Sequence, residues 1–280
     1  MSADPIVISS YARTPMGGMQ GSLAAAKATE LGATAVGAAI DKAGVDGSDV
    51  EQIFMGCVLP AGLGQAPARQ AGMGGGLPIS TEATTVNKMC GSGMQAAIMA
   101  HDALKAGTAD IIVAGGMESM TNAPYLLTKH RSGARIGHDV TKDSMFLDGL
   151  EDAYEEGRLM GSFAEEAAQE YQLTREAQDA YAIESLARAN AAIESGAFDG
   201  EVTPVEIKTR KGSEIVDTDE QPGNARPDKI PTLRPAFAKD GTVTAANASS
   251  ISDGAAALVL TRESVAQDKD MPIKARIVAH

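Results

Sequence analysis

One cysteine stands out as a residue that could do covalent chemistry. Cys90 lies in the stretch Asn87-Lys88-Met89-Cys90-Gly91-Ser92-Gly93-Met94. A short β-rich run precedes it and an apolar helical pattern follows it, which predicts a strand, a tight turn and a helix. Backbone N–H groups without partners at a helix start favour a thiolate, which is the nucleophilic form of the side chain. Cys90 is therefore the candidate nucleophile, and Gly91 and Gly93 keep the approach to it open.

The helix after Cys90 is expected to lie in the middle of a domain. Apolar residues recur in it at helical spacing, namely Met94, Ala97, Ile98 and Leu104. Further apolar residues, mostly alanines, fill the remaining faces, so the helix is apolar nearly all round. Such a helix can be approached closely on several sides. Gly107 ends it, and residues 111–116 follow as a second buried strand.

The other reactive side chains offer Cys90 little help. Cys57 falls in an expected strand at 50–58 without a glycine-flanked turn, so an inert packing role is preferred. His101 lies on the same helix as Cys90, about 16 Å further along its axis at ~1.5 Å per residue, which excludes it as the base. The other histidines are expected in solvent, at an interface or at the chain end: His130, His138 and His280.

Strands and helices alternate from Pro5 to Gly116, which predicts an α/β layered core. The expected elements are a strand at 5–10, a helix at 28–43, a strand at 50–58 and a helix from Pro67. A long polar loop follows at 121–150, then helices at 163–171 and 174–195 and a proline-broken charged segment at 202–237. A turn at 252–254 leads into a last strand at 255–260. The pattern predicts that residues 121–249 are inserted and that this last strand completes the first sheet.

Composition narrows the classes of partner. The formal net charge is −13, which argues against nucleic acid and anionic membranes. Two cysteines are too few for a disulfide framework, and no apolar run approaches membrane-spanning length, so we expect a cytoplasmic protein. The glycines at 72–76 are not followed by the Lys-Ser/Thr of a phosphate loop. An anionic ligand would need a local basic patch, and Lys208, Arg210 and Lys211 form either that patch or a solvated charge cluster.

Three motifs in order resemble the thiolase family, close to its acetyl-CoA acetyltransferases. Besides the stretch around Cys90, they are Val113-Ala114-Gly115-Gly116-Met117-Glu118-Ser119-Met120 and Gly241-Thr242-Val243-Thr244-Ala245-Ala246-Asn247-Ala248-Ser249. The resemblance covers essentially the whole chain. It implies a five-layer fold of two similar α/β halves, with a loop domain inserted in the first half.

The resemblance also implies roles for particular residues. Cys90 would accept the acyl group, and Ser249 would touch the pantetheine arm of coenzyme A, although a turn-capping role is its plain alternative. Met160 would line the pocket beside that arm, and Leu159 stands where many members have a histidine near the thioester. The implied substrate is acetyl-CoA or acetoacetyl-CoA, without metal or further cofactor. The segment after Met120 resembles the loop through which such enzymes form tetramers.

The expected domains are an N-terminal thiolase domain at 1–120 and 250–271, the loop domain at 121–249, and the start of a C-terminal domain at 272–280. Family members continue with an asparagine motif, a Gly-His-Pro motif and a second reactive cysteine, which this sequence does not contain. The sequence therefore leaves several functions open. They are acetyl-CoA acetyltransferase, an inactive fragment that keeps coenzyme A binding or subunit assembly, and a broader-chain 3-ketoacyl-CoA thiolase. A carrier-protein-dependent ketoacyl synthase fits the surroundings of Cys90 less well.

Overall fold

The computed structural model describes residues 4–209 and 212–280. The chain divides into two compact units, which are described separately below. The first comprises the described residues of 1–122, 199–218 and 252–280, and the second comprises 123–198 and 219–251. None of the described helices is long and apolar enough to cross a membrane.

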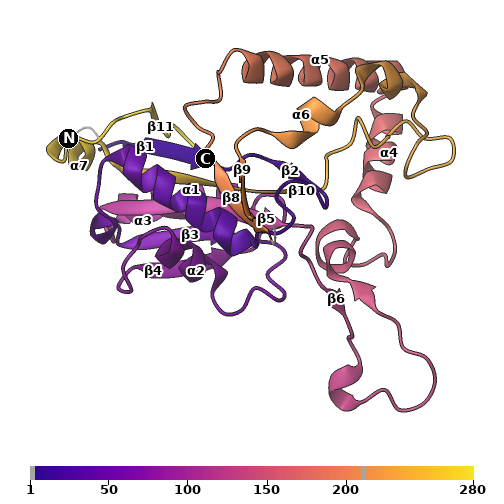
Figure 1. Ribbon diagram of the computed structural model, residues 1–280, viewed down its shortest axis with the longest axis horizontal. Helices are drawn as coiled ribbons and strands as arrows, with labels where there is room; N and C mark the ends of the chain where they lie inside the picture. The colour runs from indigo at the N-terminus through magenta and orange to yellow at the C-terminus, as the bar shows by residue number, and fades with distance from the viewer. Residues whose placement is uncertain (1–3, 210–211) are drawn as a thin grey trace. The chain divides into compact units, whose positions relative to one another are not determined.

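A mixed sheet forms the centre of the first unit (Figure 1). Its described strands are β1 (Ile6–Arg13), β2 (Gly17–Gly18), β3 (Gln52–Gly56), β4 (Glu82–Val86), β5 (Ile111–Ser119), β10 (Ser252–Arg262) and β11 (Ala275–Arg276). The strand order is β11-β1-β10-β5-β3-β4, and β2 pairs with β10. β10 runs antiparallel to β1 and β5, whereas β3 runs parallel to β4 and β5. The prediction that the last strand completes the first sheet is thus confirmed.

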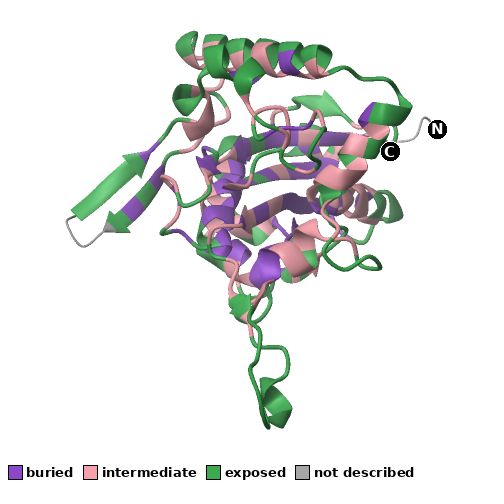
Figure 2. Cartoon of the chain, turned by 90° about the vertical axis from the view of Figure 1, so that its right-hand side faces the viewer, coloured by how far each residue is buried: buried purple, intermediate pink, exposed green. Residues whose placement is uncertain are grey.

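Helices cover both faces of this sheet. On one face α1 (Ala28–Ala43) and α2 (Pro67–Gly74) pack with strand residues such as Val113, and on the other α3 (Ser92–Ala106) packs with residues such as Ile112. Successive strand residues point to opposite faces, so one apolar strand supplies both cores. Buried residues gather in the sheet and on the covered helix faces (Figure 2). The predicted α/β layered fold is confirmed.

Several smaller elements complete the first unit. They are the short helical turn η1 (Gly47–Asp49), the hairpin of β8 (Val205–Thr209) and β9 (Gly212–Val216), and α7 (Glu263–Asp268). The hairpin lies within the stretch expected to be irregular and charged. Its apolar residues Val205, Ile207 and Val216 are buried in the α1 side of the core. The prolines and charged residues around these three positions obscure the alternation of apolar and polar residues that would have predicted two strands.

Two local expectations were wrong. Residues 252–254 are not a turn but the first part of β10, because Asp253 is buried and its carboxylate accepts the Thr121 N–H at 3.0 Å. In α3 the buried stripe is Ser92, Ala96, Ala100 and Leu104, while Met94 is 73% exposed. Residue spacing alone does not determine which of the two apolar faces of α3 packs against the sheet.

The second unit consists of helices, one two-stranded sheet and irregular segments. Its described elements are β6 (Tyr125–Leu126), η2 (His130–Ser132), β7 (Lys142–Asp143), η3 (Phe146–Leu150), α4 (Met160–Glu170), α5 (Arg175–Glu194), α6 (Glu220–Asn224) and η4 (Pro227–Thr232). The expected cap of α5 is present, since Thr174 Oγ1 accepts the Ala177 N–H at 3.2 Å. The division into a thiolase domain, a loop domain and the start of a third domain stays a prediction.

Candidate active site

Cys90 lies in the turn between β4 and α3 in the first unit, and its side chain is exposed. Gly91 is the N-cap of α3, so the cysteine immediately precedes the cap. The N–H groups of Gly91 and Ser92 are donated back to the carbonyls of Lys88 and Met89 within the turn. Because a glycine cap has no side chain, it offers no side-chain acceptor to the first helical turn, and its carbonyl accepts the Gln95 N–H at 2.8 Å.

A set of short-range hydrogen bonds fixes this turn. Asn87 Oδ1 accepts the Met89 N–H at 3.0 Å, and Ser92 Oγ accepts the Lys88 N–H at 2.8 Å. Met89 has φ = 48°, a left-handed conformation that is uncommon outside glycine. Such backbone conformations persist where the surrounding contacts over-determine them, and they cluster at functional sites. The residue before Cys90 is therefore held in one unusual conformation.

Backbone contact with the sheet sets the position of the helix start. A Cβ atom on Gly56, the last residue of β3, would lie 2.6 Å from the carbonyl carbon of Ser92. A Cβ on Gly116 of β5 would lie 3.4 Å from Gly93 Cα. The start of α3 therefore rests on strand backbone, and Gly56 has no room for a larger residue. Glycine is less strictly required at position 93, because a Cβ added there would make only ordinary van der Waals contacts.

Cys57 has a different setting from Cys90. It follows β3, is buried, and its thiol donates to Glu118 Oε1 across 3.5 Å. Burial and the neighbouring Glu118 carboxylate raise the pKa of the Cys57 thiol to about 12. The thiol is thus neutral at physiological pH, in agreement with the expected packing role.

The histidines do not approach Cys90 in the contacts of the described residues. His101 Nδ1 and His280 Nε2 both lie against Asp102 Oδ1, at 3.0 and 2.9 Å. In the second unit His130 pairs with Asp139 at 2.7 Å. The exclusion of His101 as a base for Cys90 is consistent with these contacts.

The other three predicted site residues belong to the second unit. Leu159 is the half-buried N-cap of α4, and Met160 is the first residue of that helix and is 43% exposed. Ser249 lies exposed in the loop that follows η4. Among the described residues its hydroxyl makes no hydrogen bond, so it caps no turn there. A role in ligand binding stays a prediction for all three.

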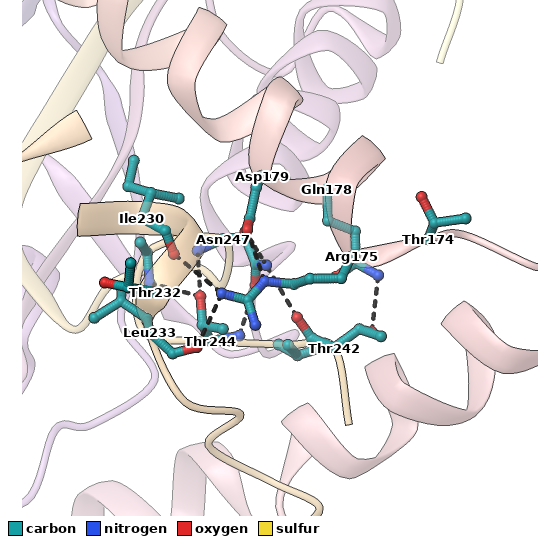
Figure 3. A network of polar contacts seen from close by, with 12 residues as sticks. Thr174, Arg175, Gln178, Asp179, Ile230, Thr232, Leu233, Thr242, Thr244 and Asn247 are labelled. Carbon is teal, nitrogen blue, oxygen red and sulfur yellow. Dashed lines mark hydrogen bonds and ion pairs between the residues drawn. The ribbon is translucent and has the colours of Figure 1, made fainter. Parts of the chain in front are cut away.

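Two helices anchor the loop that carries Ser249. On α4 the Glu165 carboxylate accepts the N–H groups of Thr242 and Val243 at 2.8–3.0 Å. On α5 Asp179 is buried between Arg175, whose Nε donates to it at 2.7 Å, and Asn247, whose Nδ2 donates at 3.0 Å (Figure 3). Within the second unit, these contacts hold the Ser249 loop against α4 and α5.

Asn247 holds the loop together from within. Its Oδ1 accepts the Thr244 N–H at 2.7 Å, and its Nδ2 also donates to the Thr242 carbonyl at 3.1 Å (Figure 3). Arg175 extends the network by donating to the carbonyls of Ile230 and Leu233. The conformation of this loop is therefore fixed by polar side-chain contacts and not by regular secondary structure.

The candidate phosphate-binding cluster is only partly described. Lys208 is exposed on β8 in the first unit, whereas Arg210 and Lys211 lie outside the described residues. Both readings of the cluster stay open.

Comparison with known proteins identifies the fold. Residues 6–264 match the family model described as "Thiolase, N-terminal domain". The chain belongs to the thiolase family. It is 50% identical over 275 residues to acetyl-CoA acetyltransferase 2 of Arabidopsis thaliana, covering 97% of this chain and 68% of the relative. It is 49% identical over 276 residues to an acetyl-CoA acetyltransferase of Escherichia coli, covering 98% and 70%.

Solved thiolase structures agree with this fold. The Acat5 thiolase from Ascaris suum, in complex with coenzyme A, superposes with a TM-score of 0.91 at 39% identity, covering 98% of this chain and 70% of that one. An acetyl-CoA acetyltransferase from Syntrophomonas wolfei gives 0.92 at 40% identity, covering 97% and 68%. The chain thus corresponds to somewhat more than two thirds of each relative.

The sequence alone did not predict the structural roles of two residues, Gly56 and Glu118. Gly56 ends an ordinary-looking strand, and only the packing of α3 shows why it must be glycine. Glu118 was part of a recognised motif, but no role was assigned to it. An acidic residue inside an otherwise apolar run of small residues was the available signal.

Proposed function

We propose that this thiolase chain is an acetyl-CoA C-acetyltransferase that works through an acetyl-Cys90 intermediate. The observation that carries the proposal is the exposed thiol of Cys90 at the start of α3, in a turn fixed by hydrogen bonds and by glycine contacts. The relatives named acetyl-CoA acetyltransferase, at 45–50% identity over nearly the whole chain, support the acetyl group as the one transferred.

The proposed first step is acyl transfer to sulfur. The Cys90 thiolate attacks the thioester carbonyl of acetyl-CoA, the tetrahedral intermediate collapses, and coenzyme A leaves as a thiolate that takes up a proton. In the second step a base removes a proton from the methyl group of another acetyl-CoA. The resulting carbanion attacks acetyl-Cys90, giving acetoacetyl-CoA and regenerating the Cys90 thiolate. The reverse sequence cleaves acetoacetyl-CoA.

The residues proposed to bind coenzyme A lie in the second unit. Ser249 would contact the pantetheine arm, and Met160 and Leu159 would line the pocket at the start of α4. The exposure of Ser249 and Met160 and the anchoring of their segments to α4 and α5 support this assignment. The side chain of Leu159 can neither donate nor accept a proton, so it cannot be the base of the second step. Family resemblance supports assembly as a homotetramer, and the relative from Gibberella zeae, named as cytosolic, supports the cytosol.

The runner-up function is a chain that performs only the first step, or only binds coenzyme A. The observation in its favour is that the described contacts of His101, His130 and His280 are with aspartates and not with Cys90. A base for the second step is therefore not identified among these three histidines. A thiolase of broader chain length is the third candidate, because Leu159 places an apolar side chain where many family members have a histidine.

An isotope-exchange experiment tests the proposal. The protein is incubated with acetyl-CoA and labelled free coenzyme A. A ping-pong route through acetyl-Cys90 predicts label in acetyl-CoA, loss of exchange in Cys90→Ala, and retained exchange in the matched Cys57→Ala variant. Absence of exchange in the wild-type chain would contradict the proposal. Thiolysis of acetoacetyl-CoA, measured alongside, separates full turnover from the first step alone.

A further inference from the structure

Glu118 lies where the parallel strands β3 and β5 separate. Their ladder ends at the pair Gly56 and Gly116, and beyond it the Glu118 carboxylate binds the chain that leaves β3. Its Oε2 accepts the Val58 N–H at 2.8 Å, and its Oε1 accepts the Leu59 N–H at 3.0 Å. The side chain thus replaces the strand-to-strand hydrogen bonds that the separated backbones can no longer make.

Partial burial makes it unfavourable for this carboxylate to carry a charge. Burial raises the pKa of Glu118, and the two backbone N–H groups act in the opposite direction. Its contacts among the described residues are with the N–H groups of Val58 and Leu59 and the Cys57 thiol, and they include no cation. A half-buried charge held by backbone donors binds that backbone more strongly than a neutral acceptor would.

The segment that Glu118 holds is connected to the turn of Cys90. The Val58 carbonyl accepts a long hydrogen bond from Asn87 Nδ2, at 3.4 Å. The other end of the same amide, Oδ1, accepts the Met89 N–H at 3.0 Å. Met89 is the residue with φ = 48°, and Cys90 follows it directly. A chain of contacts therefore runs from Glu118 through Val58 and Asn87 to the nucleophile.

We propose that Glu118 is a positioning residue for the Cys90 turn, acting through Val58 and Asn87. The proposal rests on the proposed acetyl transfer for its effect on rate, but the coupling itself concerns only the structure of the turn. In Glu118→Gln one carboxylate oxygen becomes an NH₂ donor, which faces an N–H donor of the backbone. One of the two anchoring bonds is then lost, and the restraint on Asn87 is weakened.

The chain offers a matched control. Glu51 is another carboxylate that accepts backbone N–H groups between the same two strands, from Asp110 and Ile111. It lies just before β3, at the opposite end of the strand from Gly56. Glu51→Gln therefore makes the same chemical change in the same sheet, far from the Cys90 turn along β3.

Two measurements test the proposal on the 280-residue protein. The first is hydrogen exchange of the peptide that contains residues 86–93. Glu118→Gln is expected to speed its exchange about tenfold, while Glu51→Gln leaves it unchanged. Unchanged exchange in Glu118→Gln, or equal acceleration in both variants, would overturn the coupling whether or not the protein transfers acetyl groups.

The second measurement is the rate of acetyl transfer from acetyl-CoA to Cys90. Glu118→Gln and Asn87→Ala are each expected to slow it about tenfold, and the double variant also only about tenfold, because both act along one path. Glu51→Gln should stay within about twofold of wild type. A double variant about a hundredfold slower would overturn the shared path. A wild-type protein that accepts no acetyl group would refute the proposed function and leave the exchange measurement to decide the coupling.

Discussion

Gly56 determines how close α3 can come to the sheet, and so where Cys90 is presented. An added Cβ would lie 2.6 Å from a backbone carbonyl carbon, which cannot move without shifting the helix start. We expect Gly56→Ala to lower the free energy of unfolding by about 1–3 kcal/mol and to slow acetylation of Cys90. Urea denaturation and acetylation rate measure the two effects.

Gly200→Ala is the control for this prediction, because a Cβ there would meet no heavy atom within 4 Å. It should leave both quantities close to those of wild type. Equal stability of the Gly56→Ala and wild-type proteins would show that the start of α3 is not packed on β3 as described.

The Cys57 thiol gives a prediction about pH. Its pKa is raised to about 12 by burial and by Glu118, whereas a cysteine in an unfolded chain titrates near ~8.5. Between these values the unfolded state has lost the proton that the folded state keeps. This contribution to stability is complete below about pH 8.5 and falls as pH rises, by up to about 1.4 kcal/mol per pH unit.

Cys57→Ser tests this prediction, because serine keeps a donor for Glu118 but does not titrate in this range. Urea denaturation between about pH 9 and about pH 10.5 should show a steeper loss of stability for wild type than for the variant. Parallel pH dependences would mean that the thiol is not held in its protonated form.

At the scale of elements, the loop carrying Ser249 depends on helix α5. The Asp179 side chain is 6% exposed and pairs with Arg175, which is 19% exposed, and it also accepts from Asn247. Asp179→Ala leaves the guanidinium without its partner and the loop amide without an acceptor. We expect a loss of about 3–5 kcal/mol in the free energy of unfolding, measured by urea denaturation.

The same helix supplies a control. Glu184 pairs with Arg188, but both side chains are well exposed, at 61% and 78%. Glu184→Ala should therefore change stability little, because exposed ion pairs contribute little. If the two variants lost similar stability, Asp179 would not be the anchor that the described contacts imply.

The sequence predicted the regular elements better than the irregular ones. The bounds of α1 and the cap at Thr174 follow from local signals, a glycine after the helix and a hydroxyl before it. The burial of Ala96 and the exposure of Met94 on α3 do not, because they depend on which face the sheet covers. The Ser249 loop has no periodicity at all, and its structure is set by Asp179 and Glu165 from distant positions.

The candidate site shows the same division. Cys90 could be predicted because strand, turn, glycine and helix signals coincide within a few residues. The roles of Gly56 and Glu118 could not, since they come from strand neighbours that only the fold brings together. The sequence pattern predicts the turn that carries Cys90, whereas the contacts that support this turn come from the packing of the sheet.

At the scale of the whole molecule, the chain belongs to the thiolase family. Cys90 and the residues that support its turn lie in the first unit. The residues proposed to bind coenzyme A lie in the second unit: Leu159, Met160 and Ser249. The chain covers 68–70% of the Arabidopsis and Escherichia coli relatives. The proposed function depends on acceptance of the acyl group by Cys90.

The most direct test of that claim is to map the acetyl group by mass spectrometry after incubation with acetyl-CoA alone. We expect one acetyl group on the peptide containing Cys90, none on Cys57, and its removal when free coenzyme A is added. A folded protein that carries no acetyl group on Cys90, or carries it on Cys57 instead, would contradict acyl transfer to Cys90.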